Sequence, residues 1–157
     1  MAEIVEKVRT ILTKLNLESA PVPIERVANL FSIKIVPYSK FPQQISGTII
    51  KDENFIAIGV NSNDAVVRQR FTIAHELGHF LLGHDIAQTL DDAKLDRPID
   101  NEKEADKFAA ELLIPIDFLK KDIESGIKNL AELSRRYEVS EQAMSVRLLN
   151  TGLINKL

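Results

Sequence analysis

The sequence predicts an α+β protein, in which a small sheet region is flanked by helices. Runs rich in β-branched residues are concentrated between residues 33 and 60, and segments with apolar residues at helical spacing lie on both sides of them. The chain has 157 residues, which is enough for one domain with a substantial core. The expected order is two helices, three strands and five helices.

Two helices separated by a break are predicted at the N-terminus. Apolar residues recur at helical spacing in the first segment, which we expect to end near Asn16. We expect this apolar face to pack in the core. Pro23 follows the break and suits the first turn of a short helix through Leu30.

Three strands are predicted next, because these runs combine high β-branched content with flanking turn residues. Asp52–Asn54 is expected to form a hairpin turn between the last two strands, and Pro37–Ser46 is expected to be a surface loop. The strand segments are Ile33–Val36, Gly47–Ile50 and Phe55–Val60.

The remaining chain is predicted to be helical apart from one polar stretch. Asn61–Asp64 offers N-caps for a long helix, and Gly83 is suited to end it. The polar stretch Asp85–Asp100, which contains Asp91 and Asp92, fits either an ordered loop or a mobile lid. The predicted helices after it are Asn101–Leu113, Pro115–Ser125, Lys128–Tyr137 and Ser140–Asn150.

Composition excludes several classes of protein. There is no cysteine, which excludes disulfides and a cysteine metal site and suits the cytoplasm. The N-terminal segment lacks the apolar region of a secretory signal, and no apolar run is long enough to span a membrane. The net charge of −3 gives no reason to expect nucleic acid as a partner, and the sequence does not predict an oligomeric state.

The segment His75-Glu76-Leu77-Gly78-His79 has the pattern H-E-x-x-H. Residues at positions i and i+4 lie on one face of a helix, so His75 and His79 can direct their imidazoles at one Zn²⁺ ion. Glu76 leaves the helix beside that ion, where it can take a proton from a water at the metal. Histidine is otherwise scarce, with three in the chain, which favours a metal site over a packing role.

A catalytic zinc usually has three protein ligands, so a third is expected downstream. Glu102 and Asp106 share a helix face, and we assign Glu102 as the third ligand and Asp106 as the acceptor for an imidazole N–H. Glu104 is the rival ligand, but it points about 200° around the helix from Glu102. A solvent-exposed helix face is the alternative for Glu104.

The third histidine, His84, follows His79 by five residues and does not repeat the i+4 spacing. The set H-x₃-H-x₄-H also lacks the longer spacing of the metzincins. We therefore place His84 outside the ligand set, as a structural residue or one at the edge of the site.

Two segments, FTIAHELGHFLLGH and NEKEADKFAAELLIP, resemble the ImmA/IrrE family of bacterial and phage metallopeptidases. The resemblance extends from about Pro21 to Ile154. It implies a zincin-like (gluzincin-like) fold in which His75, His79 and Glu102 are the zinc ligands and Glu76 is the catalytic carboxylate. We expect a single domain, 1–157, with an N-terminal helix (1–20), a zincin-like core (21–126) and a helical C-terminal subregion (127–157).

The resulting hypothesis is a zinc-dependent peptidase in which Glu76 is the general base. A strand within Gly47–Val60 is expected to pair with an extended substrate, and the group that stabilises the oxyanion is not identified. The family implies a helix-turn-helix transcriptional repressor as the protein substrate. The alternative hypothesis is a non-proteolytic regulatory module, resembling an antitoxin or antirepressor, with structural zinc.

A third hypothesis, a DNA-binding regulator, rests on the C-terminal helices. Leu130–Tyr137 and Ser140–Leu149 resemble a helix-turn-helix, with Ser140 as the N-cap of the second helix. A recognition helix needs basic residues, whereas Ser140–Asn150 contains only Arg147. We therefore expect a scaffold or partner-docking role, and nucleic-acid binding is not expected.

Overall fold

The computed structural model describes residues 2–90 and 97–157 and divides into two compact units. The sheet unit is Pro23–Ala109, and the helical unit combines the chain up to Val22 with Ala110–Leu157. The predicted stretch that includes Asp91 and Asp92 lies partly outside the described residues. The expectation of one domain with three subregions stays a prediction.

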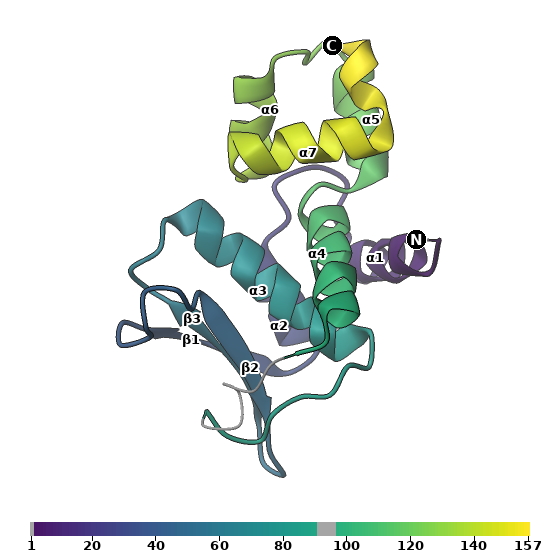
Figure 1. Ribbon diagram of the computed structural model, residues 1–157. Helices are drawn as coiled ribbons and strands as arrows, with labels where there is room; N and C mark the ends of the chain where they lie inside the picture. Colours follow the sequence, from purple (N-terminus) through teal and green to yellow (C-terminus); the bar gives the residue numbers. More distant parts are fainter. Residues whose placement is uncertain (1, 91–96) are drawn as a thin grey trace. The chain divides into compact units, whose positions relative to one another are not determined.

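The sheet unit contains a three-stranded mixed sheet, which confirms the α+β class (Figure 1). The spatial order is β1-β3-β2, in which β3 pairs parallel with β1 and antiparallel with β2. The predicted hairpin is confirmed, and Asp52 Oδ1 closes its turn by accepting hydrogen bonds from the N–H groups of Asn54 and Phe55. The elements are α2 (Ile24–Leu30), β1 (Ile33–Tyr38), β2 (Gly47–Lys51), β3 (Ile56–Asn61), α3 (Val66–Leu81) and the first turns of α4 (Ile99–Leu113).

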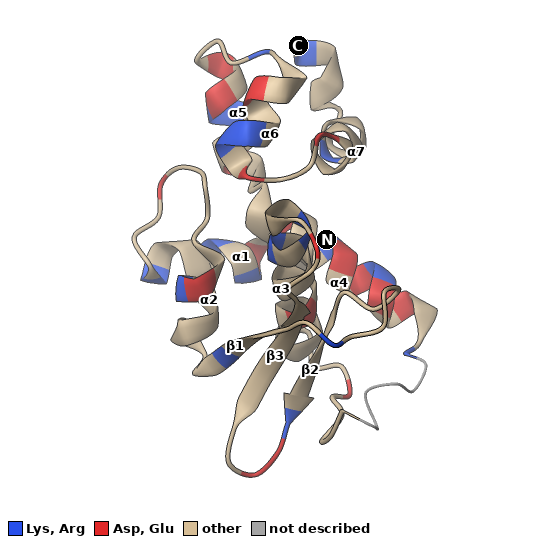
Figure 2. Cartoon of the chain, turned by 90° about the vertical axis from the view of Figure 1, so that its left-hand side faces the viewer, with Lys and Arg blue, Asp and Glu red and all other residues tan. Residues whose placement is uncertain are grey.

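The core of the sheet unit lies between the sheet and α3, which contacts β2 and β3 (Figure 1). Apolar side chains fill this space, including the fully buried Ile58 and Leu77. The strands carry few charges, whereas acidic and basic side chains alternate along α4 (Figure 2). This contrast is expected when a sheet is covered and a helix keeps one face in solvent.

Helices α3 and α4 approach closely at Gly78. A Cβ atom at this position would lie 3.1 Å from Phe108 Cβ and 3.2 Å from Ala105 Cα. The glycine inside the His–Glu motif therefore has a packing role, because it lets the two helices come close enough to share one site.

One edge of the sheet is only partly covered. The carbonyl of Ser46 accepts from the N–H of Asn61, and the N–H of Asp52 donates to the carbonyl of Phe55. Because bonding residues alternate along an antiparallel pair, the backbone groups of Gly47, Ile49 and Lys51 point outward from the sheet. The N–H of Lys51 donates to the carbonyl of Ala87 over 2.9 Å. The open part of the β2 edge, among the described residues, is therefore Gly47–Ile49.

The helical unit contains four α-helices and a short 3₁₀ helix in addition to the last turn of α4, counted over the described residues. Buried apolar side chains from each of them form its core, including Leu12, Leu119, Leu133 and Leu148. The elements are α1 (Ala2–Lys14), α5 (Ile116–Glu124), α6 (Leu130–Tyr137), α7 (Glu141–Thr151) and the short 3₁₀ helix η2 (Leu153–Lys156).

A buried ion pair joins α7 to the junction between α4 and α5. The Arg147 guanidinium donates to the Glu111 carboxylate and to the carbonyl of Ile114, and Glu111 also accepts from the N–H of Ile116. Arg147, the only basic residue of α7, is thus buried in the core.

The predicted N-cap of α3 is wrong, because the capping position is Ala65, which has no side-chain oxygen. The asparagines of the expected cap have other partners. Asn61 accepts from the N–H of Asn63 and donates to the carbonyl of Ile45, and Asn63 donates to the carbonyl of Ser39. They hold the preceding loop instead of the helix.

The predicted loop from Pro37 is wrong in its first two residues, because β1 continues through Tyr38. Proline is tolerated there because β1 is an edge strand. The Ser140 N-cap is confirmed, since its Oγ accepts from the N–H of Ala143. No helix in the described parts of the chain has the length and apolar character needed to cross a membrane.

Candidate metal centre

The paired histidines lie on the same face of α3, as the i, i+4 spacing requires. Their Nε2 atoms are 3.1 Å apart, and with Glu76 they form a group whose potential metal-binding atoms lie within 4.8 Å of one another. The His79 side chain is 1% exposed and that of His75 is 14% exposed. Both imidazoles thus point toward one partly enclosed position.

Glu102 reaches the same position from α4. Its Oε2 lies 3.1 Å from His75 Nε2, and its Oε1 lies 2.8 Å from His79 Nε2. Ligand atoms at 2.0–2.1 Å from a tetrahedral zinc ion lie about 3.3 Å from one another. Three potential ligand atoms therefore converge with nearly the spacing that zinc requires.

The hydrogen bonding of Glu102 also fits a cation. Its Oε1 lies near His79 Nε2 and 2.9 Å from Arg97 Nε, but neither contact has the angles of a hydrogen bond. This buried oxygen has no hydrogen-bond donor among the described residues. Arg97 offsets the charge of this oxygen but leaves it without a hydrogen bond, which is costly in a buried position, so the donor set fits a metal ion.

Glu76 lies beside this position and is 1% exposed. Arg97 Nη1 donates to both of its carboxylate oxygens, over 2.8 and 3.1 Å. Burial raises the pKa of Glu76, and the positive charge of Arg97 opposes this rise. The carboxylate is therefore a stronger base than a solvated one, and the Arg97 guanidinium favours its ionised form.

Asp106 lies where the sequence places it, one turn beyond Glu102. Its Oδ1 is 2.7 Å from His75 Nδ1, the nitrogen that faces away from the metal position. Burial lowers the pKa of His75, but the hydrogen bond to Asp106 and the nearby carboxylates outweigh it, so the pKa is raised. This geometry suits an acceptor that fixes the tautomer of His75.

His84 contacts the second histidine. Its Nδ1 lies 2.9 Å from His79 Nδ1, and its Nε2 lies 3.3 Å from Glu104 Oε1. Burial, with the positive charge of Arg97 next, lowers the pKa of His79 to about 3. His79 is consequently neutral at pH 7, the form in which an imidazole binds a metal.

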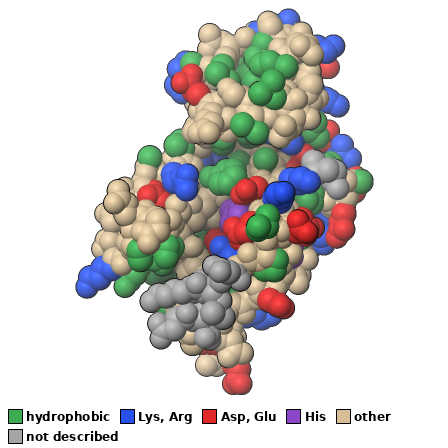
Figure 3. Space-filling model, viewed as in Figure 1, with side chains coloured by type: hydrophobic (Ala, Val, Ile, Leu, Met, Phe, Trp, Pro, Cys, Tyr) green, Lys and Arg blue, Asp and Glu red, His purple; other side chains and the backbone are tan. Residues whose placement is uncertain are grey.

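A cleft of about 970 Å³ in the sheet unit is lined by His75, Glu76, Arg97, Glu102 and Asp106. Figure 3 shows histidine at the bottom of a hollow with acidic side chains beside it. The β2 residues Gly47 and Thr48 form part of the cleft wall, so the open sheet edge and the metal position face the same space. The wall also includes apolar and aromatic side chains, namely Tyr38, Phe41, Pro42, Ile45, Phe71 and Leu90.

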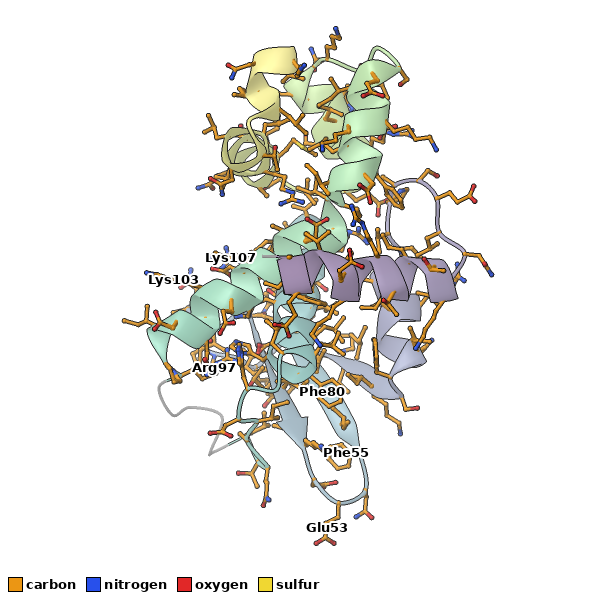
Figure 4. The ribbon with its side chains drawn as sticks, turned by 90° about the vertical axis from the view of Figure 1, so that its right-hand side faces the viewer. Glu53, Phe55, Phe80, Arg97, Lys103 and Lys107 are labelled. Carbon is orange, nitrogen blue, oxygen red and sulfur yellow. The ribbon has the colours of Figure 1, made fainter. Side chains whose placement is uncertain are left out.

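The structure brings together all five residues predicted for the site, and their roles stay predictions. Sequence reasoning missed Arg97, which lies just before α4 and on the other side of that helix from Lys103 and Lys107 (Figure 4). Its sequence context has no periodicity or motif that marks it. The sequence placed His84 outside the ligand set, as a structural residue or one at the edge of the site, but its specific contact with His79 was not predicted, although the glycine before His84 was a usable signal.

A helix that presents His–Glu–x–x–His in a cleft beside a sheet edge defines a class of metal-dependent peptidases. The chain belongs to this class through its family: the IrrE N-terminal-like domain of peptidase family M78 matches residues 28–149, so the protein is a member of this metallopeptidase family. No curated protein matches the sequence.

One similar solved structure is described as a Mycobacterium tuberculosis transcriptional regulator. It superposes with a TM-score of 0.65 at 16% sequence identity, over 94% of this chain and 46% of that one. At this identity the similarity establishes a shared fold alone. The chain spans about half of the length of that protein.

Proposed function

We propose that the protein is a cytoplasmic zinc-dependent peptidase that cleaves a regulatory protein, with a helix-turn-helix repressor as the expected substrate. The convergence of His75 Nε2, His79 Nε2 and Glu102 beside the buried Glu76 carries this proposal. A purely structural zinc site usually has four protein ligands and needs no buried carboxylate alongside. A zincin-like core is the fold that fits these features.

The residues of the chain have separate tasks in this mechanism. His75, His79 and Glu102 would hold zinc, which supplies Lewis acidity at this point of the cleft. Glu76 accepts the proton of the attacking water and passes it to the leaving amine. Its raised pKa suits both steps, since it must take up a proton and then release it.

Substrate binding is assigned to the open edge of β2. Gly47–Ile49 can pair with an extended peptide by strand addition, next to the metal position. Pairing cannot continue past Ile50 on this side, because Ala87 already bonds to Lys51. The register of a bound peptide is therefore restricted to a short segment.

The regulatory target is proposed from one observation, the description of a solved structure with the shared fold as a transcriptional regulator. The helical unit is assigned a scaffold or docking role, because the only cation of α7 is buried in an ion pair. This arrangement disfavours direct contact of α7 with DNA phosphates.

The decisive experiment measures zinc binding and cleavage in the same three proteins. Wild type and Glu76→Gln should each bind one zinc ion, whereas Glu102→Ala should lose it. A peptide library derived from cellular proteins, analysed by mass spectrometry, should show defined cleavage by zinc-loaded wild type and none by Glu76→Gln. Equal cleavage by Glu76→Gln would refute the role of this carboxylate.

A second outcome separates the alternative function. If wild type binds zinc but cleaves neither the library nor intact helix-turn-helix repressors, the chain is a binding module. If wild type binds no zinc, the ligand set is wrong.

A further inference from the structure

We propose that His84, supported by Glu104, is a positioning residue that fixes the tautomer and orientation of the candidate zinc ligand His79. The inference rests on the proposed function, in that it takes His79 to be a ligand. It assigns a task to a histidine that the ligand set does not use.

The backbone first places His84 against His79. Gly83 has a left-handed conformation, with φ +76°, and ends α3. The N–H of His84 donates to the carbonyl of His79 over 3.0 Å, and that of Gly83 donates to the carbonyl of Phe80 over 3.3 Å. These two bonds form a Schellman motif, which turns the chain back over the last turn of the helix.

The side chains then form a continuous series of contacts. His79 Nδ1 lies 2.9 Å from His84 Nδ1, and His84 Nε2 lies 3.3 Å from Glu104 Oε1. The His84 side chain is 8% exposed, so it is shielded from water that could otherwise replace it as a partner. Glu104 is half exposed, at 52%.

One arrangement of protons satisfies this series. A neutral imidazole carries one proton, and His79 must keep the lone pair of Nε2 for the metal. Its proton is therefore on Nδ1 and is donated to the lone pair of His84 Nδ1. The proton of His84 is then on Nε2 and is donated to the Glu104 carboxylate.

The same geometry excludes His84 as a metal ligand. Its Nδ1 faces the Nδ1 side of the His79 ring, whereas the metal position lies on the Nε2 side with His75 and Glu102. The two histidine ligands thus have different supports. His75 bonds directly to Asp106, and His79 reaches a carboxylate through a second imidazole.

The test compares two substitutions of nearly identical shape at His84. Asparagine places a carbonyl oxygen close to the former Nδ1 and can accept from His79, whereas leucine cannot. Loss of such a partner typically weakens metal binding about 10- to 100-fold. We expect His84→Leu to weaken zinc binding by this factor, His84→Asn to restore most of it, and Glu104→Gln to weaken it less than His84→Leu.

Zinc affinity is measured by competition with a chelator at pH 7, and thermal unfolding of the metal-free proteins checks that each variant folds. Asp85→Asn is the matched control, because it removes an exposed carboxylate next to His84 and should leave the affinity unchanged. If His84→Leu does not fold, the zinc affinity of Glu104→Gln is compared with that of Asp85→Asn to test the proposal, because both variants change exposed side chains.

The outcomes separate this inference from the proposed function. Wild-type affinity in His84→Leu, or equal losses in His84→Leu and His84→Asn, would overturn the positioning role and leave the metal site intact. Equal affinities in Glu104→Gln and Asp85→Asn would remove Glu104 from the series and, if His84→Leu does not fold, would overturn the proposal. Failure of wild type to bind zinc would overturn both proposals.

Discussion

Replacing Arg147 with methionine tests whether α7 belongs to the core of the helical unit or offers a cation to nucleic acid. The side chain of Arg147 is 6% exposed and that of its partner Glu111 is 3% exposed. After the substitution, Glu111 keeps only the N–H of Ile116 as a hydrogen-bond donor among the bonds described. The Ile114 carbonyl also loses the hydrogen bond that it accepts from Arg147.

The expected loss follows from this burial. Removing one member of a buried ion pair typically costs 3–5 kcal/mol, so we expect Arg147→Met to lower the free energy of unfolding by about 3–5 kcal/mol. That is a large part of the roughly 5–15 kcal/mol that stabilises a typical domain. Glu111→Gln added to Arg147→Met should recover most of the loss, because it removes the unpaired charge and keeps an acceptor for Ile116.

Urea unfolding followed by circular dichroism measures these free energies. Arg135→Met is the control, since this exposed arginine of α6 should change the free energy of unfolding by no more than about 0.5 kcal/mol. A loss below about 1 kcal/mol for Arg147→Met would refute the buried pair. Salt-dependent binding of duplex DNA that Arg147→Met abolishes would then favour the DNA-binding hypothesis.

Three further measurements follow from the structure. Gly78→Val should weaken zinc binding and lower the unfolding temperature, because its side chain collides with Phe108 across α3 and α4; unchanged values would refute the close approach. Zinc affinity should fall about tenfold per pH unit below the raised pKa of His75, because protonation removes one neutral imidazole. His79, with a pKa of about 3, takes up a second proton only near that pH, so a two-proton slope at pH 5–6 would contradict the assignment. Ser140→Ala should lower the free energy of unfolding by about 1 kcal/mol in a urea titration, because α7 loses its N-cap; no change would show that the cap contributes nothing.

The part of the site that the sequence predicted is the part set by helical geometry. His75 and His79 share a face because they are four residues apart, and the same spacing aligned Glu102 with Asp106. A helix alone cannot show what faces it, so the convergence of α3 and α4 depended on Gly78, whose role emerges only from the distance to Phe108.

The missed features depend on tertiary contacts. The parallel pairing of β1 with β3 leaves no mark in the sequence of either strand, whereas the β2–β3 turn does. Asn61 and Asn63 have the composition of a helix cap, but the loop before them competes for their side chains. Arg97 is one arginine among others until its carboxylate partners are known.

The His84 contact was closer to being predictable. Gly83 indicated the end of the helix, and a Schellman ending returns the second residue after the cap toward the last turn. The next side chain in sequence would then face a histidine one turn earlier. The helix end at Gly83 and the geometry of a Schellman ending together predict the contact between His84 and His79, whereas the spacing of five residues along a straight helix does not.

The short open edge of β2 has a consequence for the kinetics of cleavage. A peptide that pairs with Gly47–Ile49 must offer free N–H and C=O groups, and a helix has already used those groups in its own i to i−4 bonds. If the edge binds substrate as proposed, a folded helical target would resist cleavage until its scissile segment unwinds. The rate of cleavage would then depend on how often that segment opens, so the local conformational stability of the target would determine how long it persists.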